Sequence, residues 1–277
     1  MIKNVVVFSD THLGCQLAVC KRIRLDAGGH YEPSRIQKTL YKWWNTFWNE
    51  WVPEATGGDD YILVHNGDII DGVHHRATTQ ISQNINDQKN LALEMLHPIV
   101  NLPHCKGYYQ IRGTEAHAGL AQEYEENIAQ QLGAIPNEDG QYSRYDLWLK
   151  FGEHSLLTHF AHHIGVTNSA AYETTAVLKE LIEAYTEAGR WDKVPPDIVV
   201  RSHRHRFSKV ELPSKNDNAI SVVTPSWQLK TPFVWKMGMG RSSTPQIGGL
   251  LIREGREVNI YCRQKIWNLD RSKEVEV

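Results

Sequence analysis

Several short apolar segments of the chain end in an aspartate or a histidine. The residues of these types that follow such segments are Asp10, His12, Asp68, His159, His203 and His205. Carboxylate oxygens and imidazole nitrogens are the usual ligands of divalent metal ions. In extended backbone, residues two apart point to the same side, as expected for Asp10 with His12 and for His203 with His205. A turn or cap would explain Asp68 alone, but the collective pattern predicts a binuclear metal centre built from strand ends.

The elements that must position these residues alternate between strands and helices in the first half of the chain. The expected strands and helices there are 5–9, 35–51, 61–66, 87–101, 108–112 and 124–132. This alternation indicates βαβ units and a largely parallel sheet, whose active sites lie at the carboxyl ends of the strands. From residue 142 onward we expect a hairpin over 145–160, a helix over 171–188, and then the strands 197–201, 207–212, 219–224, 247–252 and 257–263. We interpret residues 1–277 as a single domain.

The first predicted helix carries four tryptophans, and their role has two interpretations. Trp43, Trp44, Trp48 and Trp51 fall at steps of three and four with other apolar residues. Such a stripe could stack nucleobases, but helical spacing beside a buried strand favours a place in the core. Pro53 is expected to end this helix.

The composition excludes some classes of function. The 277 residues contain 30 Lys and Arg against 32 Asp and Glu, for a formal net charge of −2. Any binding to nucleic acid must therefore be local. No apolar run approaches the about 20 residues of a membrane span, and four cysteines are too few for a disulfide scaffold. We expect a cytoplasmic protein that does not enter a membrane.

The order of the motifs resembles the calcineurin-like metallophosphoesterases over about residues 4–260. The matching segments are Asp10-Thr11-His12, Gly67-Asp68-Ile69-Ile70-Asp71, His159 and His203-Arg204-His205. The run Ser9–Gly14 is most similar to the nuclease branch, the double-strand-break repair nucleases and their bacterial relatives. The resemblance implies an α/β fold, a four-layer α-β-β-α sandwich of two mixed β-sheets flanked by helices. It also implies hydrolysis of phosphate esters with two divalent metal ions, manganese first, with zinc, iron or nickel as alternatives.

The resemblance also assigns roles to individual residues. Asp10, His12 and His205 would hold the first metal, His159 and His203 the second, and Asp68 would bridge both. Asp71 would lie behind them and orient a ligand or the neighbouring loop.

The third motif departs from the family pattern. The family has Gly-Asn-His, and this chain has Gly113-Thr114-Glu115, with His117 two residues later. In the family the Asn ligates the second metal, and the His contacts the substrate phosphate or the leaving group. If the loop is extended, we expect Glu115 to turn to the second metal and His117 to serve as general acid or phosphate contact. An alternative of almost equal weight is that His117 caps a helix that starts near Gly119.

Positive charge near the last motif indicates an anionic substrate. Arg201, Arg204, Arg206 and Lys209 surround the two histidines, and such residues attract phosphates. Thr114 and Arg204 are the candidate substrate contacts. We predict a phosphodiesterase acting on nucleic acid or nucleotides. The alternatives are a phosphomonoesterase of phosphoproteins or small molecules, and a non-catalytic, metal-stabilised interaction module. Six retained ligands argue against the last, because a buried charge that loses its metal costs stability.

Overall fold

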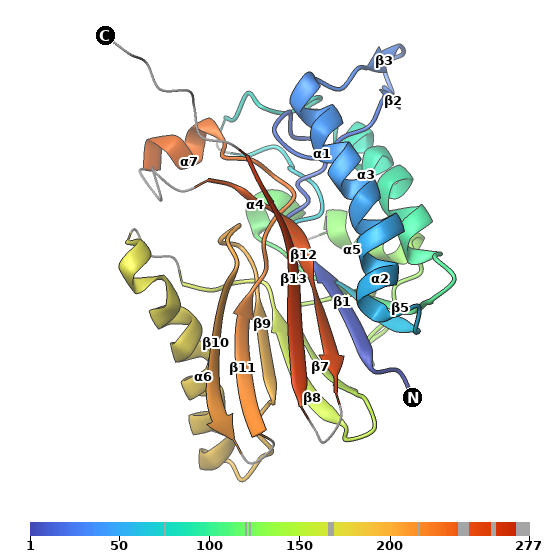
Figure 1. The fold of residues 1–277 in the computed structure, drawn as a ribbon. Coiled ribbons are helices and arrows are strands. Elements are labelled where there is room, and N and C mark those ends of the chain that lie inside the picture. Colours follow the sequence, from blue (N-terminus) through green and yellow to red (C-terminus); the bar gives the residue numbers. More distant parts are fainter. Residues whose placement is uncertain are drawn as a thin grey trace.

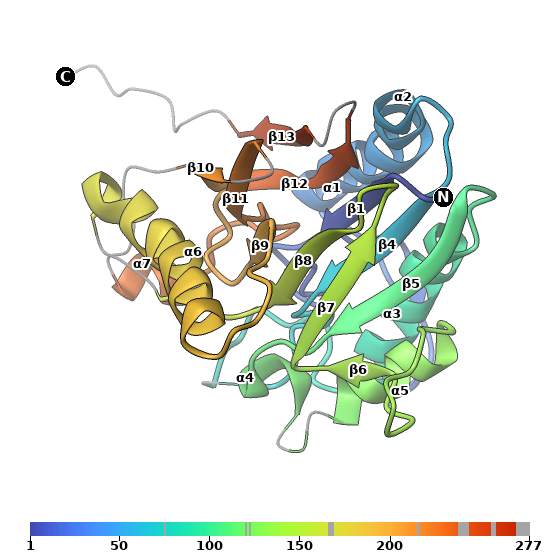
Figure 2. The same cartoon turned by 90° about the horizontal axis from the view of Figure 1, so that it is seen from below.

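Two mixed β-sheets lie face to face, with helices on the outer face of each (Figure 1). The structure is a computed structural model and describes residues 1–74, 76–119, 121, 123–165, 169–214, 217–237, 244–255 and 259–269. Figure 2 shows the two sheets and the helices around them from below.

The first sheet has β1 near its middle. Its strands, in spatial order, are β13 (Ile260–Asn268), β12 (Gln246–Glu254), β1 (Asn4–Phe8), β4 (Tyr61–Asn66), β5 (Cys105–Ile111) and β6 (Ser143–Arg144). The strands β1, β4, β5 and β6 are parallel, whereas β12 runs antiparallel to β1 and to β13. All five residues of β1 are buried, as expected for a strand covered on both faces.

The second sheet carries the predicted hairpin at one edge. Its strands, in spatial order, are β10 (Ser208–Ser214), β11 (Asp217–Val223), β9 (Ile198–Arg201), β8 (Leu156–Ala161) and β7 (Asp146–Phe151). The facing sides of the two sheets share one apolar core, in which Val5 and Val64 of the first sheet join Phe160 and Val200 of the second.

Helices complete the four layers. The first sheet is covered by α1 (Arg35–Thr46), the π-helical η1 (Phe47–Trp51), α2 (Val52–Thr56), α3 (Ile85–Val100) and α5 (Glu123–Gln131). The second sheet is covered by α6 (Glu173–Arg190), whose Leu181 packs against Val199 and Ala219. The short elements are β2 (Ile23–Arg24), β3 (His30–Tyr31), α4 (Glu115–Ala118), η2 (Ala170–Tyr172) and α7 (Pro232–Met237). The predicted α-β-β-α sandwich of two mixed sheets is therefore confirmed.

Three of the four tryptophans lie in the core, as predicted, and Trp43 is half-buried and packs against it. Trp44, Trp48 and Trp51 are at most 4% exposed. The expected helix end at Pro53 is wrong, because the chain passes through the π-helical turn and continues into α2. Pro53 occupies the first turn of that new segment, where its missing N–H costs little. Gly57, in the left-handed conformation at φ 66°, ends the helix instead.

Within the described ranges, no helix combines the length and the apolar character that crossing a membrane requires.

Candidate metal centre

Metal-ligand side chains from four strand ends meet in four overlapping groups. Three of them are Asp10, His12 and His205; His12, Asp68 and His117; and Asp68, His162 and His203. The fourth is Asp71, His74 and His117. Within each group, one ligand atom of each residue lies within 4.8 Å of the others. These residues follow β1, β4, β8 and β9, except His117, which lies in α4 after β5. The structure thus brings together five of the six predicted ligands.

The backbone turns sharply at these five residues. Asp10, His12, Asp68, His203 and His205 have φ between 39° and 68°, the left-handed region that residues other than glycine adopt at a cost. Only three other non-glycine residues of the described chain have positive φ. The extended backbone expected at Asp-x-His and His-x-His is therefore wrong. In both segments left-handed ligands are separated by one residue that faces elsewhere, and strain of this kind marks functional sites.

The first group fits a single divalent ion. The Nε2 atoms of His12 and His205 are 3.1 Å apart, and His205 Nε2 lies 3.2 Å from Asp10 Oδ1. His12 Nε2 lies 4.0 Å from the same oxygen. Ligand atoms about 2.1 Å from one ion are separated by about 3.0 to 4.2 Å. The three atoms have the spacing of ligands around one ion.

The group of Asp68, His162 and His203 adjoins the first group through Asp68. His162 Nε2 lies 3.1 Å from Asp68 Oδ2, and the same oxygen lies 3.8 Å from His12 Nε2. His162 Nδ1 donates to the carbonyl of Asn66 at 2.7 Å, which leaves Nε2 as the ligand atom. Gly67 permits this approach, because a Cβ there would lie 2.3 Å from His162 Nδ1.

Thr114 fixes the other oxygen of Asp68. The backbone N–H of Thr114 donates to Asp68 Oδ1 at 2.7 Å, and its hydroxyl lies 3.2 Å from the same oxygen. A Cβ at Gly113 would lie 2.0 Å from Asp68 Oδ1, so only glycine fits before Thr114. Thr114 therefore holds Asp68 in place, and Oδ2 is left to face both groups.

Charge and burial favour a cation in this space. Burial by itself would raise the pKa of Asp68, but attraction from His162 and His117 outweighs it and holds the pKa well below its usual range. Burial by itself would lower the pKa of His162, but the carboxylates of Asp68 and Asp10 raise it to about 10. Asp10 Oδ1 and His162 Nε2 are buried without an aligned hydrogen bond to any described residue. Such atoms cost free energy that a bound ion would remove.

His159 does not join these groups, and its predicted place is corrected. The strand β8 runs on to Ala161, so His159 points to the outer face of the second sheet. Its ring stacks on Trp148 at 4.2 Å, and its Nε2 lies 3.6 Å from Asp146. The residue that follows the end of the strand is His162. The apolar pair after His159 was the signal that the strand continues.

The third motif forms a helical turn, and this changes the placement of two residues. Thr114 is the N-cap of α4, so Glu115 and His117 lie two positions apart on a helix and point in different directions. Glu115 is exposed and belongs to none of the ligand groups in the described chain. The helix begins at Glu115, so the alternative that His117 caps a helix near Gly119 is wrong. His117 lies inside the turn and reaches the centre.

Two further predicted residues lie around the centre. Asp71 Oδ1 lies 3.8 Å from His12 Nδ1, and its carboxylate accepts hydrogen bonds from Gln80 and Gln228 at 3.0 and 3.2 Å. At 3.8 Å the carboxylate is too far from His12 Nδ1 for a hydrogen bond, so Asp71 places its charge behind the His12 ring without fixing the ring through a hydrogen bond. Arg204, predicted as a substrate contact, donates to the carbonyl of Glu173 at the start of α6 at 2.8 Å.

Sequence reasoning missed some residues of the site. His74 Nε2 lies 3.7 Å from Asp71 Oδ1, and the His74 and His117 rings are 4.4 Å apart. Gln228 comes from a segment more than 150 residues away in sequence, which no local pattern links to Asp71. Glu125 is buried behind the centre and contacts two of its loops.

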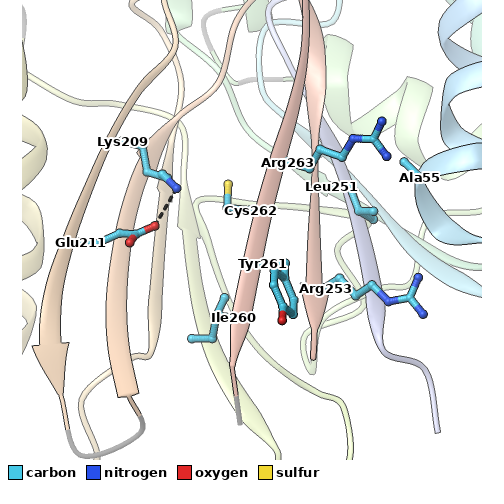
Figure 3. Close-up of a pocket in the computed structure, with 9 residues that line it drawn as sticks. All are labelled: Ala55, Lys209, Glu211, Leu251, Arg253, Ile260, Tyr261, Cys262 and Arg263. Carbon is cyan, nitrogen blue, oxygen red and sulfur yellow. Dashed lines mark hydrogen bonds and ion pairs between the residues drawn. The ribbon is translucent and has the colours of Figure 1, made fainter. Parts of the chain in front are cut away.

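A cavity of about 380 Å³ lies away from these residues, beside β13 (Figure 3). The cations that line it, Lys209, Arg253 and Arg263, pair with Glu211, Asp59 and Glu54 at 2.6, 3.0 and 2.9 Å. Because all three of these cations already have carboxylate partners, the cavity is poorly suited to bind a phosphate.

The chain matches no protein-family model and no curated protein. A crystal structure of Vps29 from Chaetomium thermophilum is similar over 97% of this chain and 98% of that chain, at 11% identity and a TM-score of 0.41. The same protein complexed with a cyclic peptide is similar over 96% of both chains, at 12% identity and a TM-score of 0.38. A solution structure of a protein from Thermotoga maritima is similar over 97% of this chain and 100% of that chain, at 10% identity and a TM-score of 0.32. Likenesses this weak say nothing about what the chain binds or catalyses.

Proposed function

We propose that this protein is a metal-dependent phosphoesterase that uses two divalent ions, and that it hydrolyses phosphodiesters of nucleic acid or nucleotides. One observation carries the proposal. Ligand-type side chains from four strand ends converge on one buried space, and five of them do so in the left-handed conformation. A fold gains nothing from such strain and such crowding of imidazoles unless the space is used.

The ligands divide between two ions. Asp10, His12 and His205 would hold the first ion, His162 and His203 would hold the second, and Asp68 would be shared. His162 thus takes the role that the family resemblance implies for His159. Two imidazoles and the shared carboxylate at the second site, with Thr114 in place of an amide ligand, suit manganese, zinc or iron.

The residues of the chain prepare the reaction. When bound, two divalent ions lower the pKa of water and offset the charge that develops on phosphoryl oxygens. The carboxylate of Asp71 lies behind the His12 ring, and Thr114 orients Asp68. His117 donates its Nδ1 proton to the carbonyl of Asp71 at 2.5 Å, which leaves Nε2 to carry a proton to the leaving group. A ring nitrogen of His117 lies within 4.8 Å of ligand atoms of His12 and Asp68, a suitable distance for this role.

A second candidate is a phosphomonoesterase. It is favoured by the contacts that the arginines near the last motif make with α6. Arg201 pairs with Glu180 at 2.8 Å, Arg206 pairs with Glu173 at 3.1 Å, and Arg204 binds the Glu173 carbonyl. These cations hold α6, so they offer less to a long nucleic-acid strand than their number suggests. Support for a diester of nucleic acid comes instead from the resemblance of Ser9–Gly14 to the nuclease branch.

Metal analysis combined with two ester assays tests the proposal. Chelated protein is refilled with Mn²⁺ or Zn²⁺ and assayed on bis-nitrophenyl and mononitrophenyl phosphate. We expect two ions per chain and faster turnover of the diester. Faster turnover of the monoester would favour the second candidate. Two ions without turnover would indicate a non-catalytic module, and protein that binds no ion would refute the proposal.

A further inference from the structure

Glu125 is a buried carboxylate that lies behind the ligands and contacts none of them directly. It is 0% exposed. Its Oε1 accepts the backbone N–H of Ile69 at 3.0 Å, and its Oε2 accepts the backbone N–H of Gly113 at 2.6 Å. One side chain of α5 therefore joins the loop after β4 to the loop after β5.

These two loops are the ones that present and fix Asp68. Ile69 follows Asp68 directly, and Gly113 precedes Thr114, whose N–H donates to Asp68 Oδ1. The loops touch without an intervening side chain, since a Cβ at Gly113 would lie 2.4 Å from the Asp68 backbone nitrogen. The distance between Asp68 and the Thr114 N–H that holds it thus depends on what holds Ile69 and Gly113 together.

We infer that Glu125 is a positioning residue of the metal centre, which sets the orientation of Asp68 by tying the Ile69 and Gly113 amides to one carboxylate. The inference rests on the proposed function. Two N–H donors from separate segments need an acceptor at each of two oxygens, and a carboxylate supplies both. A glutamine of the same shape supplies one oxygen and an NH₂ group that cannot accept. Its NH₂ group would face one of the two amides and push the loops apart.

The neighbouring residue offers a matched control. Glu126 also accepts two backbone N–H groups, from Tyr142 and Ser143, both at 2.8 Å. These donors lie at the start of β6, away from the ligands. Glu125→Gln and Glu126→Gln therefore both disturb a carboxylate that accepts two backbone N–H groups, one helix position apart. Glu126 also accepts the Ser143 hydroxyl at 2.6 Å and pairs with Arg112 at 3.5 Å, so Glu126→Gln is the more disruptive change.

The test compares both variants with the wild type. Calorimetric titration of Mn²⁺ into chelated protein gives the dissociation constants, and hydrogen exchange without metal gives the protection of individual amides. We expect Glu125→Gln to weaken Mn²⁺ binding by about 10- to 100-fold and to speed exchange at Ile69 and Gly113. Glu126→Gln should keep the dissociation constants within about twofold, even where its melting temperature falls.

Each result decides between clear alternatives. Folded Glu125→Gln with wild-type affinity for Mn²⁺ would overturn the inference and leave the proposed function intact. Wild-type protein that binds no Mn²⁺ would refute the proposed function and the inference that rests on it. If Glu125→Gln does not fold, the wild type decides. Unprotected amides at Ile69 and Gly113 in the wild type would show that their hydrogen bonds to Glu125 do not exist.

Discussion

Removal of the charge on Asp68 is the most direct perturbation of the proposed centre. Asp68→Asn keeps the size of the side chain but not its two equivalent oxygens. If the amide oxygen stays with the Thr114 N–H, the NH₂ group faces His162 and His12 at the positions 3.1 and 3.8 Å from Oδ2. If the amide turns over, NH₂ meets the Thr114 N–H at 2.7 Å. In neither orientation can the amide both accept the Thr114 N–H and offer an oxygen to the ions.

The magnitude follows from the burial of Asp68. The side chain is 2% exposed, so solvent does little to screen its charge. At about 4 Å and an effective dielectric constant of about 20, each pair of unit charges contributes about 4 kcal/mol. That value corresponds to about 10³-fold in affinity. Because the proposed ions are divalent and both contact Asp68, 10³-fold is a lower estimate for each ion.

The assay measures metal content and affinity in chelated and refilled protein, together with turnover of a phosphodiester. Asp71→Asn is the control, because Asp71 is equally buried but accepts hydrogen bonds from Gln80 and Gln228 in place of contacting ions. We expect it to cost about 10- to 100-fold. Two tightly bound ions and near-normal turnover in Asp68→Asn would refute the reasoning.

Four other predictions follow from the same geometry. His162→Ala should lose about one metal equivalent while His159→Ala keeps both, by metal analysis; the opposite pattern would restore His159 as the ligand. His203→Ala and His205→Ala should each lose about one equivalent, since they belong to different groups, and retention of both ions by both variants would contradict this. In metal-free protein the pKa of His162 is raised from 6.5 to about 10, so the stability from its pairing is complete below pH 6.5 and disappears as the pH rises to 10. The difference in unfolding free energy between wild type and His162→Ala, from urea denaturation with chelator, should shrink across that window by up to about 5 kcal/mol; a constant difference would disprove it. His117→Ala should slow an ester with a poor leaving group by about 10²- to 10⁴-fold and a nitrophenyl ester much less, whereas equal, small losses would make His117 structural.

Much of the fold could be predicted because residues close in sequence determine its helices, strands and hairpin. The apolar run of β1, the helical spacing of the tryptophans and the hairpin of β7 and β8 each depend on neighbouring residues. The pairing of β12 with β1 joins Val5 to Ile252, almost the whole chain apart, and no local pattern specifies it. The continuation of the helix past Pro53 also escaped prediction, because it depends on a π-helical turn that precedes Pro53 and leaves it in the first turn of a new segment.

The ligands could be predicted as types but not always as positions. Asp10, His12 and Asp68 stand at strand ends that the sequence marks clearly. The choice between His159 and His162 depends on where β8 stops, and a strand end moved by three residues replaces one histidine with the other. The sequence predicts an extended loop at Glu115, yet this segment forms one turn of helix. Both errors come from conformation within a few residues, where sequence patterns are weakest.

The left-handed backbone at the centre explains why these local rules fail there. A left-handed residue other than glycine costs about 1 kcal/mol, and Asp10, His12, Asp68, His203 and His205 all adopt that conformation. The sum is comparable to the about 5 to 15 kcal/mol by which a whole domain is stable. Aspartate and histidine enter this region more readily than most residues, so the residue types that bind metals also lower the cost of the turns that present them. Hydrogen bonds from behind, such as those of Thr114 to Asp68 and of Gln228 to Asp71, hold the strained loops in place. A sequence pattern can identify the ligands, but the second set of contacts that makes their conformation tolerable comes from segments that only the folded chain brings together.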